Sequence, residues 1–222
     1  MIVFLSASVK RNSVKNPDLA ETYEHHPPLN TPRIVLASTS PYRRALLERL
    51  RLPFVVHAPA VDEAAQPVES ARATALRLAQ SKAWAVARSF PRALVIGCDQ
   101  VAALDGAHLG KPGDHANAVA QLKAMRGKNV LFHTALALLN SATGNLHTAE
   151  VPTTVRFRNY DEGEIERYLE LEQPYDCAGS AKIEGLGIVL VESVTGDDPS
   201  ALIGLPLIQL ANMLRKEGVA VV

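Results

Sequence analysis

Short apolar runs alternate with segments of helical periodicity in the first half of the chain, and this alternation constrains the fold more than any other feature. Residues 34–36 and 93–97 are apolar and typical of buried strands. Between them, residues 41–50 and 70–88 carry Leu and Ala at the spacing of one helix face. Strands that alternate with helices in this way predict an α/β protein, in which helices flank a sheet.

The second half of the chain favours paired strands. Two strand-like segments, 129–139 and 146–157, are joined around residues 141–144 and are predicted to pair with each other. The fold class expected from both halves is α/β with a mixed β-sheet flanked by helices. Further strands are predicted at 54–56 and 187–194, and further helices at 114–125, 161–171 and 207–216.

Composition and charge limit the organisation of the chain and its partners. The 222 residues suffice for one domain, or for one domain with two lobes. Lys and Arg total 23, as do Asp and Glu, so no net charge recruits nucleic acid or an anionic membrane. No apolar run reaches the ~20 residues that span a bilayer, and the N-terminus lacks the features of a secretory signal. We expect a cytoplasmic protein that binds neither nucleic acid nor membrane.

The chain is expected to divide into three parts. Residues 11–32 are polar and show no helical or strand periodicity, and residues 1–32 are predicted to be a disordered extension or the result of a mis-called start. The folded domain is expected at 33–218, followed by a short tail at 219–222. Cys98 and Cys177 are too few for a disulfide framework, and we interpret both as reduced core residues.

Polar residues gather where predicted elements end, which is where binding and catalytic groups commonly lie. Residues 38–44 combine hydroxyl groups, two arginines and the free N–H groups of a helix start, which together suit a phosphate chain. Asp62 and Glu63 are adjacent acids in a loop and can hold a hard cation. Asp99 is expected to end an apolar strand, where a carboxylate is costly to bury unless it is paired or bound to a metal. Lys111 lies on a constrained Gly-Lys-Pro loop.

Each cluster also has a plainer interpretation. Residues 38–44 can form a capped helix with solvated arginines, and acid pairs in loops are usually solvated. Lys82, in the predicted helix 70–88, can contact phosphate or lie on a solvated helix face. The glycine-rich segments 178–185 and 204–206 do not match a Walker-type loop. The clusters are therefore more informative together than singly.

Taken together, these segments resemble the Maf family of nucleotide pyrophosphatases. The resemblance covers residues 33–218 and is carried by seven motifs in order, LASTSPYRRALL, VDE, LRLAQSKA, IGCDQV, GKP, CAGSAKIEGLG and IGLPL. It implies two lobes around a central cleft and an enzyme that is often a homodimer. It also implies metal-dependent cleavage of a nucleoside triphosphate between its α- and β-phosphates.

The resemblance also implies roles for the matching residues. Asp99 is expected to be the catalytic acid/base residue, and Glu63 and Asp99 are expected to contact a divalent cation. Oxygen ligands favour Mg²⁺ or Mn²⁺ over zinc. Which carboxylate binds the metal and which takes the proton stays open. The expected phosphate-binding residues are Ser38, Arg43, Lys82 and Lys111.

Three further positions bear on the base. Family members that act on dTTP and UTP carry Arg, Thr and Gln where this chain has Tyr42, Gln100 and Glu184. The subfamily that hydrolyses 7-methyl-GTP carries Gln and Glu at the last two positions and often tryptophan at the first. An aromatic ring attracts the positive charge of 7-methylguanine. A carboxylate accepts both N–H donors on the Watson–Crick edge of guanine and repels the acceptors of uracil and thymine.

The resemblance therefore favours 7-methyl-GTP as the substrate, with two alternatives. Because Tyr42 departs from the usual tryptophan, the same reaction on dTTP, UTP or another modified nucleotide stays open. A non-catalytic nucleotide-binding regulator of cell division is the second alternative. Every expected catalytic residue is present, which ranks this second alternative below catalysis.

Overall fold

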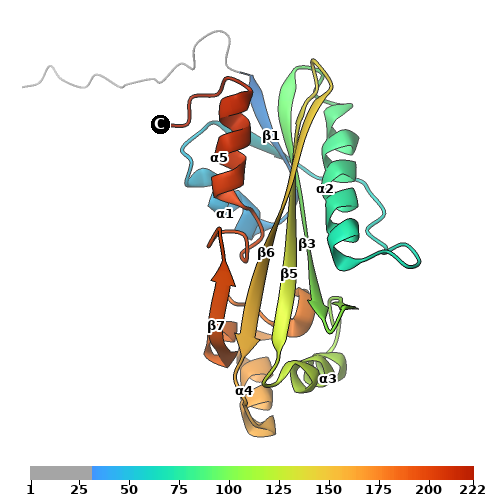
Figure 1. The fold of residues 1–222 in the computed structure, drawn as a ribbon, viewed down its shortest axis with the longest axis vertical. Coiled ribbons are helices and arrows are strands. Elements are labelled where there is room, and N and C mark those ends of the chain that lie inside the picture. The colour runs from blue at the N-terminus through green and yellow to red at the C-terminus, as the bar shows by residue number, and fades with distance from the viewer. Residues whose placement is uncertain (1–31) are drawn as a thin grey trace, which may run out of the picture. The chain divides into compact units, whose positions relative to one another are not determined.

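Three long strands, β3 (Ala93–Leu104), β5 (Asn129–Asn140) and β6 (Asn145–Phe157), form the antiparallel centre of the sheet and run along its long axis (Figure 1). The computed structural model describes residues 32–222. Apart from residue 32, the extension predicted at 1–32 lies outside the described residues.

The remaining strands complete a mixed seven-stranded sheet. Six strands follow the order β2-β1-β3-β5-β6-β7, and the seventh, β4, pairs with β3 outside this order. β1 (Arg33–Ala37) pairs in parallel with both β3 and β2 (Phe54–His57). β7 (Val191–Gly196) pairs antiparallel with β6 at the other side of the sheet. β4 (Ala107–Leu109) folds back on the end of β3 through the turn at residues 105–106. The predicted α/β fold with a mixed sheet is confirmed.

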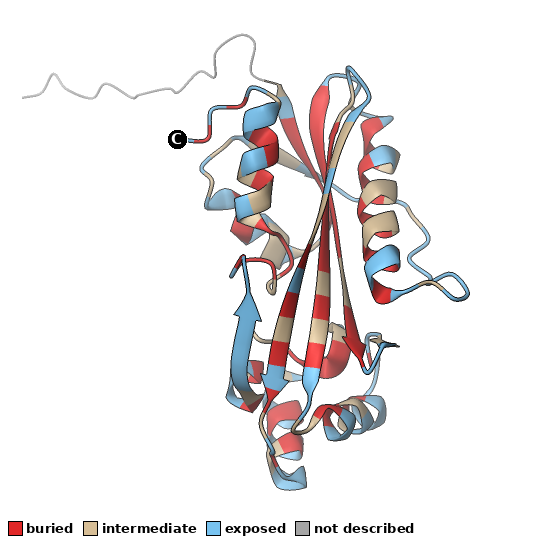
Figure 2. Cartoon of the chain, viewed as in Figure 1, coloured by how far each residue is buried: buried red, intermediate tan, exposed pale blue. Residues whose placement is uncertain are grey.

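Helices cover the sheet in two groups that correspond to two lobes (Figure 1). In one lobe, α1 (Pro41–Glu48) and α5 (Leu207–Lys216) lie on one face and α2 (Ala71–Ala87) on the other. In the second lobe, α3 (His115–Met125) and α4 (Glu162–Glu172) pack around the far ends of the long strands. β3 and β5 contribute buried residues to both lobes (Figure 2), so the lobes share one continuous sheet.

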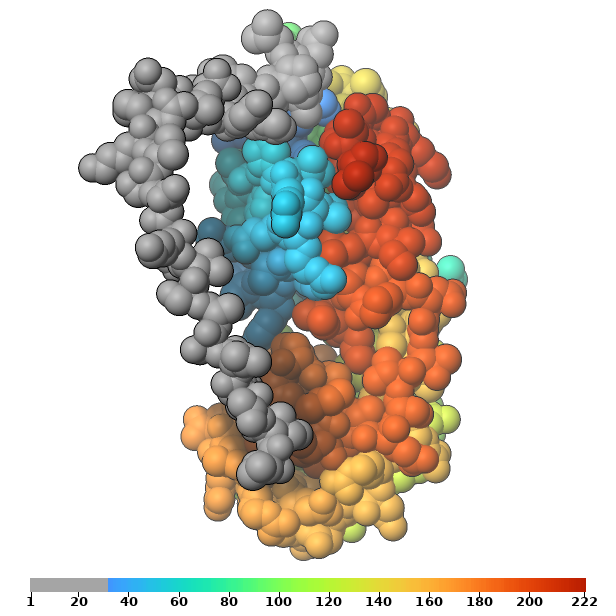
Figure 3. Space-filling model, turned by 90° about the vertical axis from the view of Figure 1, so that its left-hand side faces the viewer, coloured from blue at the N-terminus to red at the C-terminus, as the bar shows by residue number. Residues whose placement is uncertain are grey.

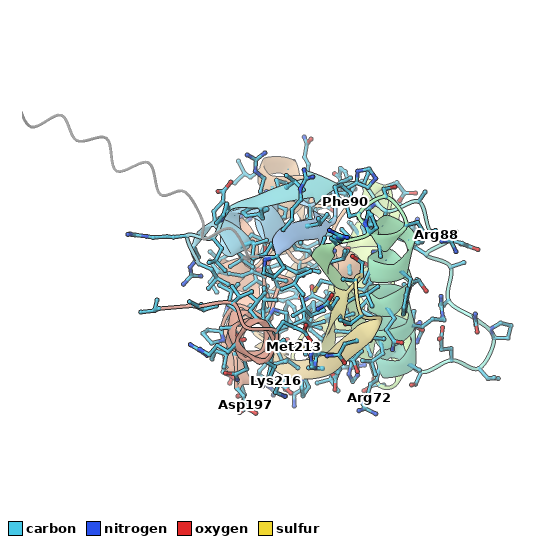
Figure 4. All side chains as sticks on the ribbon, turned by 90° about the horizontal axis from the view of Figure 1, so that it is seen from above. Arg72, Arg88, Phe90, Asp197, Met213 and Lys216 are labelled. Carbon is cyan, nitrogen blue, oxygen red and sulfur yellow. The ribbon has the colours of Figure 1, made fainter. Side chains whose placement is uncertain are left out.

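The helices α1 to α4 begin where the sequence predicts, because side chains cap their free N–H groups. Ser40, Ser70 and Asp114 each accept a hydrogen bond from a backbone N–H of the first turn. Asp161 and Glu164 form a complete capping box on α4. Amphipathic faces then orient the helices: in Figure 4 Met213 of α5 lies toward the core, whereas Arg88 extends outward from the end of α2.

An unusually close approach fixes α2 against β3. A Cβ atom on Gly97 would lie 2.0 Å from the carbonyl oxygen of Ala79 and 2.8 Å from the backbone nitrogen of Ala83. Only glycine permits this distance, and the buried alanines of α2 bring the helix backbone down onto the strand. This packing places Lys82, which lies between those two alanines, directly beside β3.

Two predicted strands differ from the structure. β3 does not end at residue 97 but continues to Leu104, because β5 pairs along nearly its whole length. Residues 187–190, predicted as strand, lie in the 3₁₀ helix η2 (Leu186–Leu190), and β7 begins only at Val191. The backbone N–H of Gly187 donates to the carbonyl of Lys182 within a tight turn, and not to a neighbouring strand of the sheet.

Two further features concern the chain end and the membrane expectation. Val219 and Val221, which follow α5, are buried against the core of the first lobe. Within residues 32–222, no helix combines the length and apolar character that crossing a bilayer requires.

Candidate active site

A break in the sheet creates a cavity between the two lobes. On the same edge of β3, β1 pairs with residues 93–97 and β4 pairs with residues 102–104. Residues 98–101 therefore have no neighbour on that edge among the described strands. The cavity opens at this break and has a volume of about 740 Å³. Figure 3 shows the corresponding face, where the blue segment after β1 stands across a hollow from the orange segment before η2.

The structure brings together the nine residues to which the family resemblance assigns a role, whereas Asp62 and Arg44, considered with them from the sequence, are exposed and do not line the cavity. The nine come from both lobes, and each of them lines the cavity. Their individual roles remain predictions. The nine residues are Ser38, Tyr42, Arg43, Glu63, Lys82, Asp99, Gln100, Lys111 and Glu184.

At the centre of this group, one lysine joins two carboxylates. Nζ of Lys82 lies 2.6 Å from Oδ1 of Asp99 and 2.6 Å from Oε1 of Glu63. Lys82 and Asp99 are 4% and 8% exposed, whereas the side chain of Glu63 is 54% exposed. A buried lysine and a buried aspartate offset each other's charge, while Glu63 approaches from the solvent side. The solvated position considered for Lys82 is therefore wrong.

Asp99 reaches Lys82 because strand residues alternate between faces. Gly97 and Asp99 share the face of β3 that packs on α2, and Cys98 and Gln100 point to the opposite face. Asp99 does not end the strand, as the sequence suggested, but lies in its middle. Although buried, it borders the cavity where β3 lacks a neighbour on one edge.

Basic residues surround the exposed carboxylate. Burial tends to raise the pKa of Glu63, but the hydrogen bond and charge of Lys82 and the charges of Lys111 and Arg43 outweigh it, so the net pKa is lowered. Arg43 is oriented by a hydrogen bond from Nε to the carbonyl of Gly204, at 3.0 Å. The lining of the cavity thus combines three cations with two carboxylates, a composition suited to a phosphate chain with a metal.

Three further residues that line the cavity are those expected to contact a base. Burial raises the pKa of Glu184, which makes its charged form more costly in the absence of a hydrogen-bond donor. Nε2 of Gln100 donates to Oγ1 of Thr134 at 2.8 Å and approaches two carbonyls of residues 201–202 at 3.0 and 3.1 Å. Its amide nitrogen is therefore engaged with the protein. Tyr42 is half-buried at the start of α1.

Sequence reasoning missed a clamp that holds the loop carrying Glu63. Arg77 of α2 donates from Nε and Nη2 to the carboxylate of Glu69, both at 2.8 Å, and from Nη2 to the carbonyl of Ala64 at 3.0 Å. Thr74 donates to the same carboxylate at 2.9 Å. A pairing between a loop acid and a residue two helical turns beyond it has no local sequence pattern that would reveal it.

A second missed group supports Arg43. Oδ1 and Oδ2 of Asp198 accept hydrogen bonds from the backbone of Ser200 and Ile208, at 2.9 and 2.8 Å. Asp198 is 3% exposed, and its carboxylate binds a backbone N–H in the first turn of α5. These contacts hold the loop whose Gly204 carbonyl accepts the hydrogen bond from Arg43. The sequence indicated only that residues 204–206 precede the predicted helix 207–216.

The two cysteines differ in their surroundings. Both are free; Cys98 is buried, whereas Cys177 is half-buried and lines the cavity, so the core position expected for Cys177 is wrong. Burial raises the pKa of Cys98 to about 11 and that of Cys177 to about 12. Neither thiol is therefore an activated nucleophile.

The donor set fits a hard cation shared with a ligand. Glu63 and Asp99 line the same cavity, contact the same ammonium group and offer carboxylate oxygens. In the described part of the chain, no three His, Cys, Asp or Glu side chains come together as a metal-binding group. Two carboxylates suit Mg²⁺ or Mn²⁺, which take their remaining ligands from water and phosphate oxygens.

Comparison with known proteins gives a consistent result. The family model described as Maf-like protein matches residues 33–217. The chain is 58% identical over 191 residues to a 7-methyl-GTP pyrophosphatase of Methylobacillus flagellatus, covering 86% of this chain and 100% of that protein. It is 59% identical over 191 residues to the protein of the same name from Thiobacillus denitrificans, covering 86% and 95%. It is 55% identical over 209 residues to that of a Polaromonas species, covering 94% and 95%.

Proposed function

The chain belongs to the Maf family, and from this premise we propose that it hydrolyses 7-methyl-GTP to 7-methyl-GMP and pyrophosphate. The observation that carries the proposal is the meeting of Lys82, Glu63 and Asp99 in a cavity that Tyr42 and Glu184 also line. We assign the first group to a phosphate end of the cavity and the second to a base end, because the first suits a triphosphate and the second suits a cationic purine. The volume of about 740 Å³ lies within the range of small-molecule sites.

The phosphate end provides charge and a proton acceptor. Arg43, Lys82 and Lys111 stabilise the negative charge that develops on the pyrophosphate leaving group. Asp99, held by Lys82, orients water against the α-phosphate and accepts its proton. Glu63 and Asp99 would hold a divalent cation, which supplies further neutralisation of phosphate charge when bound. The lowered pKa of Glu63 keeps its carboxylate ionised for this purpose.

The base end favours 7-methylguanine for electrostatic reasons. Since burial penalises the charge of Glu184, its carboxylate gains most from a ligand that donates hydrogen bonds and carries positive charge. The 7-methylguanine ring provides both, and the Tyr42 ring attracts the same charge. Uracil and thymine place acceptors where Glu184 offers only acceptors, which disfavours them.

A nucleotide panel tests this proposal. Release of pyrophosphate is measured with 7-methyl-GTP, GTP, dTTP and UTP, with Mg²⁺ or Mn²⁺ and again with a chelator. We expect the highest kcat/KM with 7-methyl-GTP, and loss of activity on chelation that added metal reverses. Faster turnover of UTP or dTTP than of 7-methyl-GTP would show that the proposed substrate is wrong. Activity that is unaffected by chelator would show that the reaction does not require a metal.

A further inference from the structure

A tight turn carries Glu184 into the cavity. The backbone N–H groups of Gly185 and Gly187 both donate to the carbonyl of Lys182, at 3.0 and 2.9 Å. A Cβ atom on Gly187 would lie 2.5 Å from that carbonyl oxygen, so the turn closes only with glycine there. Glu184 therefore takes its position from the turn that surrounds it.

The turn rests on a carboxylate outside the cavity. Glu172, the last residue of α4, accepts a hydrogen bond from the backbone N–H of Leu186 at 2.7 Å and pairs with Nζ of Lys182 at 2.5 Å. Its side chain is 14% exposed. A Cβ atom on Gly185 would lie 2.8 Å from Oε2 of Glu172, which shows how closely the turn backbone covers this carboxylate. One acid thus holds both sides of the turn around Glu184.

The same ion pair reaches the other lobe. Nζ of Lys182 lies 5.9 Å from the centre of the Tyr42 ring, within the range of a cation–π contact. The hydrogen bond to Glu172, together with the proximity of Tyr42, raises the pKa of Lys182 above its ordinary value, so the ammonium stays charged. Glu172, Lys182 and Tyr42 therefore form a chain of contacts from α4 to α1. Of these three residues, only Tyr42 lines the cavity.

We propose that Glu172 and Lys182 are positioning residues for base recognition, which hold Glu184 and Tyr42 in a fixed relation across the cavity without touching the nucleotide. The inference rests on the proposed function, because it takes this end of the cavity as the base site. An ion pair that served only the fold would affect unfolding and leave recognition unchanged. The two roles differ in what they do to KM.

Two conservative variants test the pair. Glu172→Gln keeps an acceptor for the Leu186 N–H but removes the charge, and Lys182→Met keeps most of the side-chain length but removes the ammonium. Glu170→Gln is the matched control, because Glu170 lies on the same helix and is exposed. We expect each variant to raise KM for 7-methyl-GTP about tenfold, the loss of one charged hydrogen bond, with kcat changed less than about twofold.

Three further readouts separate positioning from stability. The preference for 7-methyl-GTP over UTP should fall in both variants, while inhibition by inorganic triphosphate, which has no base, should stay at the wild-type level. The double variant should resemble either single variant, because the two residues act as one unit. The control variant should match the wild type in every measurement.

The outcomes that overturn the inference are distinct from failure of the function. Unchanged KM and preference in folded variants, or weaker inhibition by triphosphate in parallel with the rise in KM, would overturn the positioning role. If the wild type prefers UTP, the proposed base is wrong. The positioning role then predicts that both variants raise KM for UTP, and an unchanged KM for UTP would overturn it. If the wild type hydrolyses none of these nucleotides, the proposed function and the inference both fail.

Discussion

At the scale of single residues, the site depends on the pairing of one buried aspartate with one buried lysine. Asp99 lies in an apolar strand, yet it faces Lys82 at 2.6 Å and a break in the sheet edge. The sequence could mark Asp99 as an acid in an apolar run. It could not identify Lys82 as the partner, because the contact depends on how closely α2 packs on Gly97.

Replacing Asp99 tests its role as the proton acceptor. Asp99→Asn keeps the volume and an acceptor for Lys82 but removes the basic carboxylate. We expect kcat for pyrophosphate release to fall about 10²- to 10⁴-fold, with KM changed far less. Asp62→Asn is the control, because Asp62 is exposed and bonds only locally to the N–H of Ala64. A kcat for Asp99→Asn within tenfold of the wild type would exclude Asp99 as the base.

At the scale of elements, the packing of α2 on β3 sets the position of Lys82. Gly97→Ala would insert a methyl group 2.0 Å from the Ala79 carbonyl, so helix and strand must separate. We expect the free energy of unfolding in urea to fall by about 1–3 kcal/mol or more, with a loss of activity because Lys82 moves. Gly110→Ala, where nothing lies within 4 Å of the added Cβ, serves as the stability control. Equal unfolding free energies for the two variants would refute this account of the contact.

The clamp on the loop 58–69 has a pH dependence with a definite sign. The hydrogen bonds of Arg77 lower the pKa of Glu69 from 4.5 to about 2. A carboxylate with a depressed pKa stabilises the folded state above its unfolded value, and this contribution is lost as pH falls through the folded value. We expect Glu69→Gln to melt at a lower temperature than the wild type above about pH 5, with the gap closing between pH 4.5 and about 2. A gap that does not depend on pH would contradict the ion-pair explanation.

Local sequence patterns predicted which helices and strands form better than they predicted the residues at which these elements end. Caps at Ser40, Ser70, Asp114 and Asp161 mark helix starts, because a cap is a contact within one turn. The length of β3 and the 3₁₀ helix before β7 could not be predicted in this way. The first is set by pairing with β5, and the second by the turn built on Glu172.

At the scale of the whole molecule, the cavity results from two lobes that share one sheet. The sequence predicted strands that alternate with helices and later pair, and the mixed sheet follows from them. It also assigned nine residues to one site, and the structure brings them together, but this came from the family resemblance and not from periodicity. The cavity opens where the edge of β3 is left unpaired between β1 and β4. This break depends on how far β1, which is distant in sequence, pairs along β3, and no local sequence pattern encodes that.

The products formed from 7-methyl-GTP in ¹⁸O-labelled water test the central claim most directly. The full chain is incubated with the nucleotide and Mg²⁺, and the products are identified by mass spectrometry. If Asp99 directs water to the α-phosphate while Arg43, Lys82 and Lys111 hold the leaving group, the products are 7-methyl-GMP with one ¹⁸O atom and unlabelled pyrophosphate. Formation of 7-methyl-GDP and phosphate, or label in the pyrophosphate, would contradict the account.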